Sequence, residues 1–297
     1  MHLRLLPYSI LRLIFGIVFR HCKFHWKFSC SKNVPSINTK QQFSSSLHAF
    51  PFTHSETTTM ATSNSMGQYD PRKATINRDT KETQVAIQLC IDGGQLSDPS
   101  IASIPWADRT NKHAFQESKS QYVDIDTGIG FLDHMLHALA KHAGWSLWVR
   151  CHGDLHIDDH HSTEDIFLAL GNAVQSCLTS TPAASLGLNR FGHSYAPLDE
   201  ALSRAVVDLS NRPFAVINLD MHREKVGELS TEMLTHGLLS FSQAAGVTMH
   251  VDVLRGENDH HRAESAFKAL AGALRMACAR RTGVGEGEMQ STKGVLY

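Results

Sequence analysis

Two short motifs in the chain carry the residue types that bind metal ions most readily. Each motif has two adjacent histidines followed by a glutamate, in DDHHSTED (158–165) and NDHHRAES (258–265). On a helix, each histidine can share a face with the glutamate three or four positions later, whereas neighbouring histidines point about 100° apart. One ion is therefore hard to reach from both histidines of a pair. The simplest interpretation places each histidine of a pair in a different metal site.

The two motifs close the two copies of a longer internal repeat. FLDHMLHALAKHAG (131–144) aligns with MLTHGLLSFSQAAG (233–246), with a single two-residue length difference before the motif. A lone histidine at a helix start is usually a cap or a solvated residue, but ligand-type residues that recur in register are poorly explained that way. We predict eight metal ligands, three imidazoles and one carboxylate for each of two sites: His134, His160, His161, Glu164, His236, His260, His261 and Glu264.

A donor set of imidazole and carboxylate without cysteine suits Mn²⁺, Fe²⁺ or Zn²⁺, and the ligand types alone do not fix the ion. The six cysteines are scattered without CxxC spacing, which favours free thiols in a reducing compartment. Six other histidines of this region do not belong to the repeated ligand pattern, and we expect surface or structural roles for them: His113, His152, His156, His193, His222 and His250.

Several basic residues are candidates for binding a small anion. Arg190 in NRFG, Arg212 in NRP and Lys293 in STKG are each, taken alone, more typical of a solvated surface. Lys268 is the stronger candidate because it lies four positions after Glu264, on the same helix face as a predicted ligand. Proteins commonly bind phosphate with an arginine, whose planar guanidinium donates two parallel N–H groups, together with a lysine.

The elements that position these residues alternate between strand and helix patterns. We expect Gln95–Ser120, which is polar and contains two prolines, to be a surface loop. The first copy predicts the strands Thr83–Ile91 and Trp145–Cys151 and the helices Phe131–His142 and His160–Cys177. The second copy predicts the helices Leu234–Ala245 and His260–Cys278 around the strand Val247–Leu254. Two αβ repeats, 70–188 and 189–297, are therefore expected to pack about a pseudo-twofold axis as one catalytic domain.

The first 69 residues differ from the rest of the chain. No acidic residue precedes Glu56, serine and threonine are frequent, and the apolar patch Tyr8–Phe19 is too short to span a bilayer. The composition resembles an organelle transit peptide. The alternative is a natural start at Met60 or Met66, with the upstream part either a gene-model extension or a disordered tail. In that case we expect the protein to work in the cytoplasm. A net charge of −1 gives no electrostatic footprint for nucleic acid, and no membrane partner is expected.

Several longer motifs together resemble the imidazoleglycerol-phosphate dehydratase family, in its fungal form. The resemblance covers about residues 71–297. It is carried by GIGFLDHMLHALAKH (128–142), GDLHIDDHHSTED (153–165), NRFG (189–192), APLDEALSRAVVDLSNRP (196–213), NDHHRAESAFKAL (258–270) and STKG (291–294). One departure is DHMLHA (133–138), where bacterial and plant members often have DHMLDQ.

The resemblance implies a duplicated α+β fold, similar to ribosomal protein S5 domain 2, with a helical layer between two four-stranded sheets. It implies two Mn²⁺ ions per active site and a 24-subunit homo-oligomer whose sites form between subunits. The eight residues above become the metal ligands. The family's phosphate-binding positions match Arg190, Arg212, Lys268, Ser291 and Lys293, and its other substrate contacts match Glu82, His134 and His142.

The implied reaction converts D-erythro-imidazole-glycerol phosphate to imidazole-acetol phosphate in histidine biosynthesis. The proton to be removed sits on a carbon with no neighbouring carbonyl, so the imidazole ring must assist. Metals on both ring nitrogens would make an imidazolate that expels the adjacent hydroxyl, giving a diazafulvene with an acidified C–H, and the resulting enol would collapse to the ketone. Candidates for moving the proton are Glu82, His142 and Glu264.

Two other classes of function use the same ligands. A dimetal hydrolase would make a metal-bound hydroxide and would not need the phosphate-type arginines and lysines. A metal-storage or structural-metal protein would close the coordination shell and leave no catalytic pocket.

Overall fold

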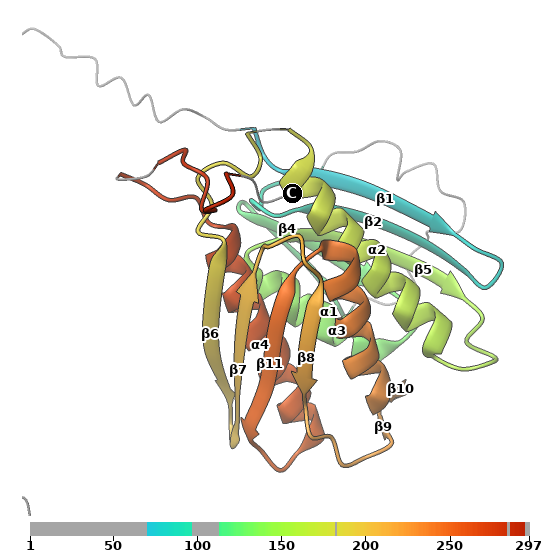
Figure 1. Cartoon of the computed structure of the whole chain (residues 1–297). Coiled ribbons are helices and arrows are strands. Elements are labelled where there is room, and N and C mark those ends of the chain that lie inside the picture. The colour runs from blue at the N-terminus through green and yellow to red at the C-terminus, as the bar shows by residue number, and fades with distance from the viewer. Residues whose placement is uncertain (1–69, 97–112, 182, 284–285, 295–297) are drawn as a thin grey trace, which may run out of the picture. The chain divides into compact units, whose positions relative to one another are not determined.

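The computed structural model describes residues 70–96, 113–181, 183–283 and 286–294. The predictions for residues 1–69 lie outside this part of the chain. Two sheets and a layer of helices between them make up the fold (Figure 1). The expected α+β class is therefore confirmed.

The first sheet has the strand order β1-β2-β5-β4-β3. Its strands are β1 (Lys73–Asp79), β2 (Thr83–Cys90), β3 (Phe115–Ser118), β4 (Gln121–Asp126) and β5 (Ser146–Gly153). β4 pairs in parallel with β5, and the other pairs are antiparallel.

The second sheet has the strand order β6-β7-β11-β8. It contains β6 (Phe191–Leu198), β7 (Ala201–Asp208), β8 (Phe214–Asn218) and β11 (Thr248–Arg255). β8 and β11 pair in parallel, as β4 and β5 do in the first sheet. A separate two-stranded ladder joins β9 (Lys225–Val226) to β10 (Leu229–Ser230).

Four described helices fill the space between the sheets: α1 (Gly130–Ala143), α2 (His160–Thr179), α3 (Thr231–Ala245) and α4 (Asp259–Cys278). The predicted helices are confirmed, with bounds that differ by a few residues. α1 and α3 end at Gly144 and Gly246, whose φ angles of 76° and 67° are left-handed. Glycine adopts this conformation without the cost that a Cβ would add, so each glycine ends its helix where the sequence predicts.

The two halves of the described chain follow one plan. β1, β2, β4, α1, β5 and α2 of the first half correspond in order to β6, β7, β8, α3, β11 and α4 of the second, and the equivalent strands have the same sheet order. α2 packs on β1 and β2, and α4 packs on β6 and β7. This arrangement is consistent with a duplicated αβ unit around one continuous hydrophobic core.

One expectation about the first sheet was wrong. The first sheet has five strands rather than the expected four, because Phe115–Ser118 pairs antiparallel with β4. These residues lie in the segment predicted as a surface loop. A four-residue edge strand with alternating exposed and half-buried side chains is too short to produce a clear periodic pattern. Residues 97–112 of the same predicted loop lie outside the described part.

None of the helices described is long and apolar enough to cross a lipid bilayer. In the described part of the chain, Cys90, Cys151, Cys177 and Cys278 are free thiols.

Candidate metal centre

The first group of predicted ligands lies between α1 and α4. His134 comes from α1, and His260 and Glu264 come from the first turns of α4. Their candidate donor atoms all lie within 4.8 Å of one another. Glu264 Oε2 lies 3.1 Å from His134 Nε2 and 3.3 Å from His260 Nε2. We call these three residues the α1–α4 cluster.

The second group repeats this arrangement between α2 and α3. His160 and Glu164 come from α2, and His236 comes from α3. Their donor atoms also lie within 4.8 Å of one another, and His236 Nε2 lies 3.0 Å from Glu164 Oε1. The rings of His160 and His236 have centroids 4.9 Å apart. We call these residues the α2–α3 cluster.

The aspartate before each histidine pair connects its helix start to a segment distant in the sequence. Asp159 accepts hydrogen bonds from the backbone N–H and the hydroxyl of Ser230, the residue before α3. Asp259 accepts the backbone N–H groups of His222 and Arg223. Both aspartates are buried. Each one fixes the helix turn that presents the predicted ligands, a role that we did not predict from the sequence.

The second histidine of each pair lies apart from both clusters. His161 Nδ1 donates to Asp154 Oδ2 at 3.0 Å, and His261 Nδ1 donates to Glu200 Oε2 at 2.7 Å. These carboxylates raise the pKa of His161 and His261. Six of the eight predicted ligands are thus gathered in two groups, and His161 and His261 point elsewhere because adjacent helix positions diverge. Asp154 and Glu200 are further residues that sequence reasoning missed.

The two clusters differ in one nearby charge. Lys268 Nζ lies 2.7 Å from Glu264 Oε1, whereas the position four residues after Glu164 is Leu168. Burial alone would raise the pKa of Glu264, but hydrogen bonds from Lys268 and His134 outweigh it and lower the pKa to about 2. Glu264 is therefore an anion throughout the neutral range and a weak proton acceptor.

Most of the predicted phosphate-binding residues gather near the end of β7. Arg190 donates to both oxygens of Asp208 at 2.7 and 3.1 Å, and Arg212 Nη2 lies 3.5 Å from Asp208 Oδ2. Arg190 Nη1 also donates to the carbonyl of Gln290, next to Ser291 in the segment that carries Lys293.

Lys268 is the member of the predicted phosphate set that lies apart. The backbone N–H of Arg190 donates to the carbonyl of Ala277, nine residues after Lys268 on α4. At 1.5 Å per residue this corresponds to about 13 Å along the helix axis. Within one chain, the predicted set is therefore divided into two groups.

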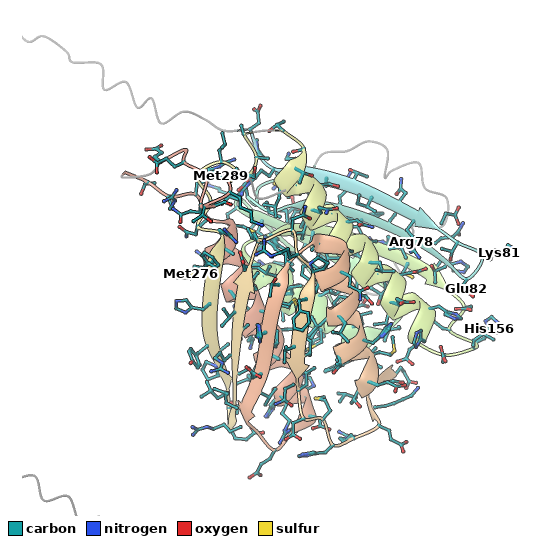
Figure 2. All side chains as sticks on the ribbon, in the orientation of Figure 1. Arg78, Lys81, Glu82, His156, Met276 and Met289 are labelled. Carbon is teal, nitrogen blue, oxygen red and sulfur yellow. The ribbon has the colours of Figure 1, made fainter. Side chains whose placement is uncertain are left out.

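The other predicted substrate residues also separate. Glu82 lies in the turn between β1 and β2, with His156 close to it at the same end of the first sheet (Figure 2). Its Oε1 is 3.9 Å from His161 Nε2, and its side chain is 55% exposed. His142 lies in the last turn of α1, where burial and the charge of Lys268 lower its pKa.

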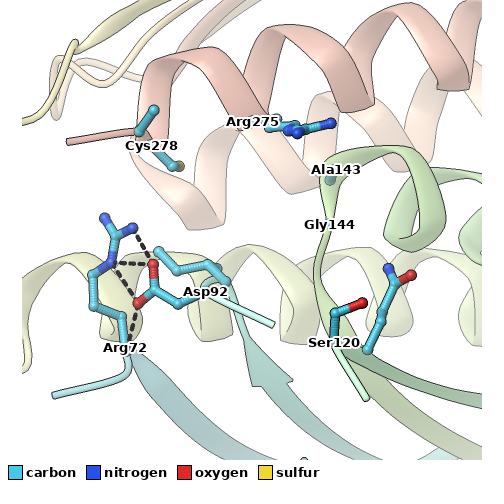
Figure 3. Close-up of a pocket in the computed structure, with 10 residues that line it drawn as sticks. Arg72, Asp92, Ser120, Ala143, Gly144, Arg275 and Cys278 are labelled. Atoms are coloured by element: carbon cyan, nitrogen blue, oxygen red, sulfur yellow. Dashed lines mark hydrogen bonds and ion pairs between the residues drawn. The ribbon is translucent and has the colours of Figure 1, made fainter. Parts of the chain in front are cut away.

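A cavity of about 420 Å³ has no predicted metal ligand among its lining residues, several of which are drawn in Figure 3. It is lined in part by Arg72, Asp92, Gly144, Arg275 and Cys278. The Arg72 side chain is 5% exposed and that of Asp92 is 34% exposed. Arg72 donates to Asp92 from its backbone N–H at 2.8 Å and from Nε at 2.9 Å. This ion pair fastens the start of β1 to the end of β2.

We expect Asp92→Asn to lower the free energy of unfolding by about 2 kcal/mol, because it leaves the buried guanidinium of Arg72 without its counter-charge. Burial would raise the pKa of Asp92, but the hydrogen bonds from Arg72 lower it below its usual value. The stabilisation is therefore present above the unfolded pKa and is lost as pH falls through the lower folded pKa. Urea unfolding at pH 7 and below pH 4 checks this. The exposed Asp79→Asn should change little, and equal effects at both positions would contradict the assignment.

Comparisons with known proteins agree on one family. A family model described as imidazoleglycerol-phosphate dehydratase matches residues 127–274, a span that contains both clusters. The chain is 60% identical over 226 residues to imidazoleglycerol-phosphate dehydratase of Neurospora crassa, covering 76% of this chain and 96% of that relative. It is 58% identical over 226 residues to the protein of that name from Pyricularia oryzae, covering 76% and 98%.

Comparison with solved structures points to the same family. The crystal structure of imidazoleglycerol-phosphate dehydratase from Staphylococcus aureus matches with a TM-score of 0.54 at 30% identity, covering 70% of this chain and 99% of that chain. The chain therefore belongs to the imidazoleglycerol-phosphate dehydratase family of hydro-lyases, and the resemblance predicted from its motifs is confirmed.

Proposed function

We propose that this chain dehydrates D-erythro-imidazole-glycerol phosphate to imidazole-acetol phosphate, a step of histidine biosynthesis, through imidazolate and diazafulvene forms of the substrate. The observation that carries the proposal is the pair of matched clusters, each with two imidazoles and one carboxylate. The family membership favours this reaction over a dimetal hydrolase or a metal-storage protein.

The residues of both clusters fit a divalent cation of the manganese type. Each offers two imidazole nitrogens and one carboxylate oxygen within 4.8 Å of one another. Three donors from one chain leave positions for a further ligand and for substrate, and we propose two Mn²⁺ ions per active site. When bound, these ions would supply Lewis acidity at the two ring nitrogens of the substrate.

Two features support sites that are completed by a neighbouring subunit. His161 and His261 point away from the clusters of their own chain, so each is free to serve as the third imidazole of a cluster in another copy. The backbone of Arg190 contacts Ala277, which lies about 13 Å along the α4 axis from Lys268, so the predicted phosphate residues leave the backbone at two separate places in one chain. We propose a homo-oligomer, with 24 subunits as the family resemblance implies.

Within such a site, the basic residues hold the phosphate and a separate group moves the proton. Arg190 and Arg212 supply planar forks suited to phosphate oxygens, with Ser291 and Lys293 beside them. Glu264 serves as a metal ligand, since its pKa of about 2 makes it a poor base. Glu82 and His142 remain the candidates for proton transfer. We also propose that residues 70–188 and 189–297 are two αβ repeats that form one catalytic domain, and that the protein works in the cytoplasm.

The test is a direct assay. We would purify the full chain without metal under anaerobic conditions, add Mn²⁺, Fe²⁺ or Zn²⁺ separately, and measure formation of imidazole-acetol phosphate. The expected result is product formation that depends on added metal, with Mn²⁺ the most effective. Absence of product after Mn²⁺ loading would contradict the proposed function.

A further inference from the structure

The two histidines outside the clusters share one unusual feature. Each has its Nδ1 held by a carboxylate, Asp154 for His161 and Glu200 for His261, at 3.0 and 2.7 Å. Asp154 follows β5, whereas Glu200 lies in the turn between β6 and β7. These carboxylates are not counterparts in the repeat, so duplication does not explain the shared contact. Two different elements supply the same hydrogen bond to equivalent imidazoles.

The hydrogen bond determines which ring nitrogen can bind a metal. An ionised carboxylate only accepts, so the proton of the neutral imidazole resides on Nδ1, and Nε2 keeps its lone pair. Both Nε2 atoms face outward toward exposed carboxylates. His161 Nε2 lies 3.9 Å from Glu82, and His261 Nε2 lies 3.7 Å from Asp199.

We propose that Asp154 and Glu200 are positioning residues, which hold His161 and His261 as Nδ1–H tautomers so that each Nε2 is presented to a metal ion shared with a neighbouring subunit. The inference rests on the proposed function, because it requires that these histidines are metal ligands. Metal-binding histidines commonly donate their second ring N–H to a carboxylate, which fixes the ring orientation.

The surroundings of Asp154 support a dedicated role. Its side chain is 17% exposed, and its Oδ1 is buried without a hydrogen-bond partner among the described residues. Burying a carboxylate oxygen that has no hydrogen-bond partner costs desolvation energy. The hydrogen bond that its side chain makes in the described structure goes to His161.

Glu200 is attached to the helix whose histidine it holds. Its Oε1 accepts the backbone N–H groups of Glu257 and Asn258, at 3.1 and 2.9 Å, immediately before α4. Its Oε2 remains for His261. The carboxylate therefore fixes the helix start and the imidazole together, so that the ring direction follows the helix.

Because Glu200 makes both contacts, Glu200→Gln can change the contact with His261 while keeping the contacts with the backbone. The amide oxygen can keep the two backbone N–H groups, while the amide nitrogen faces His261 Nδ1 as a donor. The proton of His261 is then favoured on Nε2, where it blocks metal binding. Loss of such a supporting contact typically costs 10- to 100-fold in metal affinity, and we expect an effect of about that size.

At the other position, Asp154→Ala removes the acceptor and Asp154→Asn can restore one. We expect Asp154→Ala to weaken Mn²⁺ binding by about 10- to 100-fold and Asp154→Asn to recover part of the loss. Because Mn²⁺ binding is the affected step, saturating Mn²⁺ should return much of the lost activity. If Asp154 acted only through packing, neither Asp154→Asn nor saturating Mn²⁺ would restore what Asp154→Ala loses.

The experiment is a Mn²⁺ titration of the metal-free full chain by calorimetry, with the thermal midpoint of each metal-free variant measured alongside. Glu232→Gln, an exposed glutamate in the first turn of α3, is the matched control and should bind as the wild type does. Wild-type affinity in both Glu200→Gln and Asp154→Ala would overturn the positioning roles. A wild-type chain that binds no Mn²⁺ would instead contradict the metal centres of the proposed function. The two positions are tested separately, so a folding defect at one leaves the other decisive.

Discussion

Replacement of His236 by alanine is expected to abolish one of two metal sites and most of the activity. His236 Nε2 lies 3.0 Å from Glu164 in the α2–α3 cluster, and its removal leaves that cluster with one imidazole and one carboxylate. Metal analysis should show about one tightly bound Mn²⁺ per chain instead of two, and kcat/KM should fall by about 10³-fold or more, because one Lewis acid is lost.

The control for this variant is His250→Ala. His250 is an exposed histidine of β11 and has no ligand-type counterpart in the repeat, so its metal content and kcat/KM should match the wild type. The side chain of His236 is 39% exposed, so its removal should cost little stability. Two tightly bound ions in His236→Ala would show that the α2–α3 cluster is not a metal site.

The second large effect concerns the phosphate group of the substrate. Arg212→Ala is expected to lower kcat/KM by about 10- to 100-fold, because a charge-assisted hydrogen bond to phosphate is worth about 1.5–3 kcal/mol. Its side chain is 63% exposed and lies 3.5 Å from Asp208, so the fold should lose little. Arg212→Lys keeps the positive charge but loses the planar guanidinium, so its kcat/KM should lie between those of the wild type and Arg212→Ala.

Arg204→Ala provides the comparison, since Arg204 forms an exposed ion pair with Asp252 on the second sheet and is not in the predicted phosphate set. Steady-state kinetics on each variant, with the thermal midpoint as a check on folding, separates the two positions. Equal losses at Arg204 and Arg212, or none at Arg212, would remove Arg212 from the phosphate site.

The clusters could be predicted from the sequence because the spacing of their residues follows local rules of helix geometry. A histidine and a glutamate four positions apart must share a helix face, and the repeat places an equivalent pair on a second helix. The partners His134 and His236 could be predicted because they recur at matched positions in the preceding helices. The glycines that end α1 and α3 then fix where those helices stop.

Contacts between distant segments could not be predicted in the same way. Glu200 reaches His261 across 61 positions, and Asp159 reaches Ser230 across 71. Neither spacing has a periodic signal, and each depends on how strands and helices pack. The separation of Arg190 from Lys268 along α4 likewise emerges only from the fold. The short strand β3 was missed because four residues are too few to show a period.

We propose that two matched clusters of imidazole and carboxylate groups hold the ions on which dehydration by this chain depends. The most direct test is to measure Mn²⁺ per chain and the rate of imidazole-acetol phosphate formation on the same sample, as metal is removed with a chelator and then restored. We predict two ions per chain when Mn²⁺ is saturating, loss of activity as they are removed, and recovery when Mn²⁺ returns. Full dehydratase activity in a chain that has lost both ions would show that the two clusters are not the metal centres of the reaction.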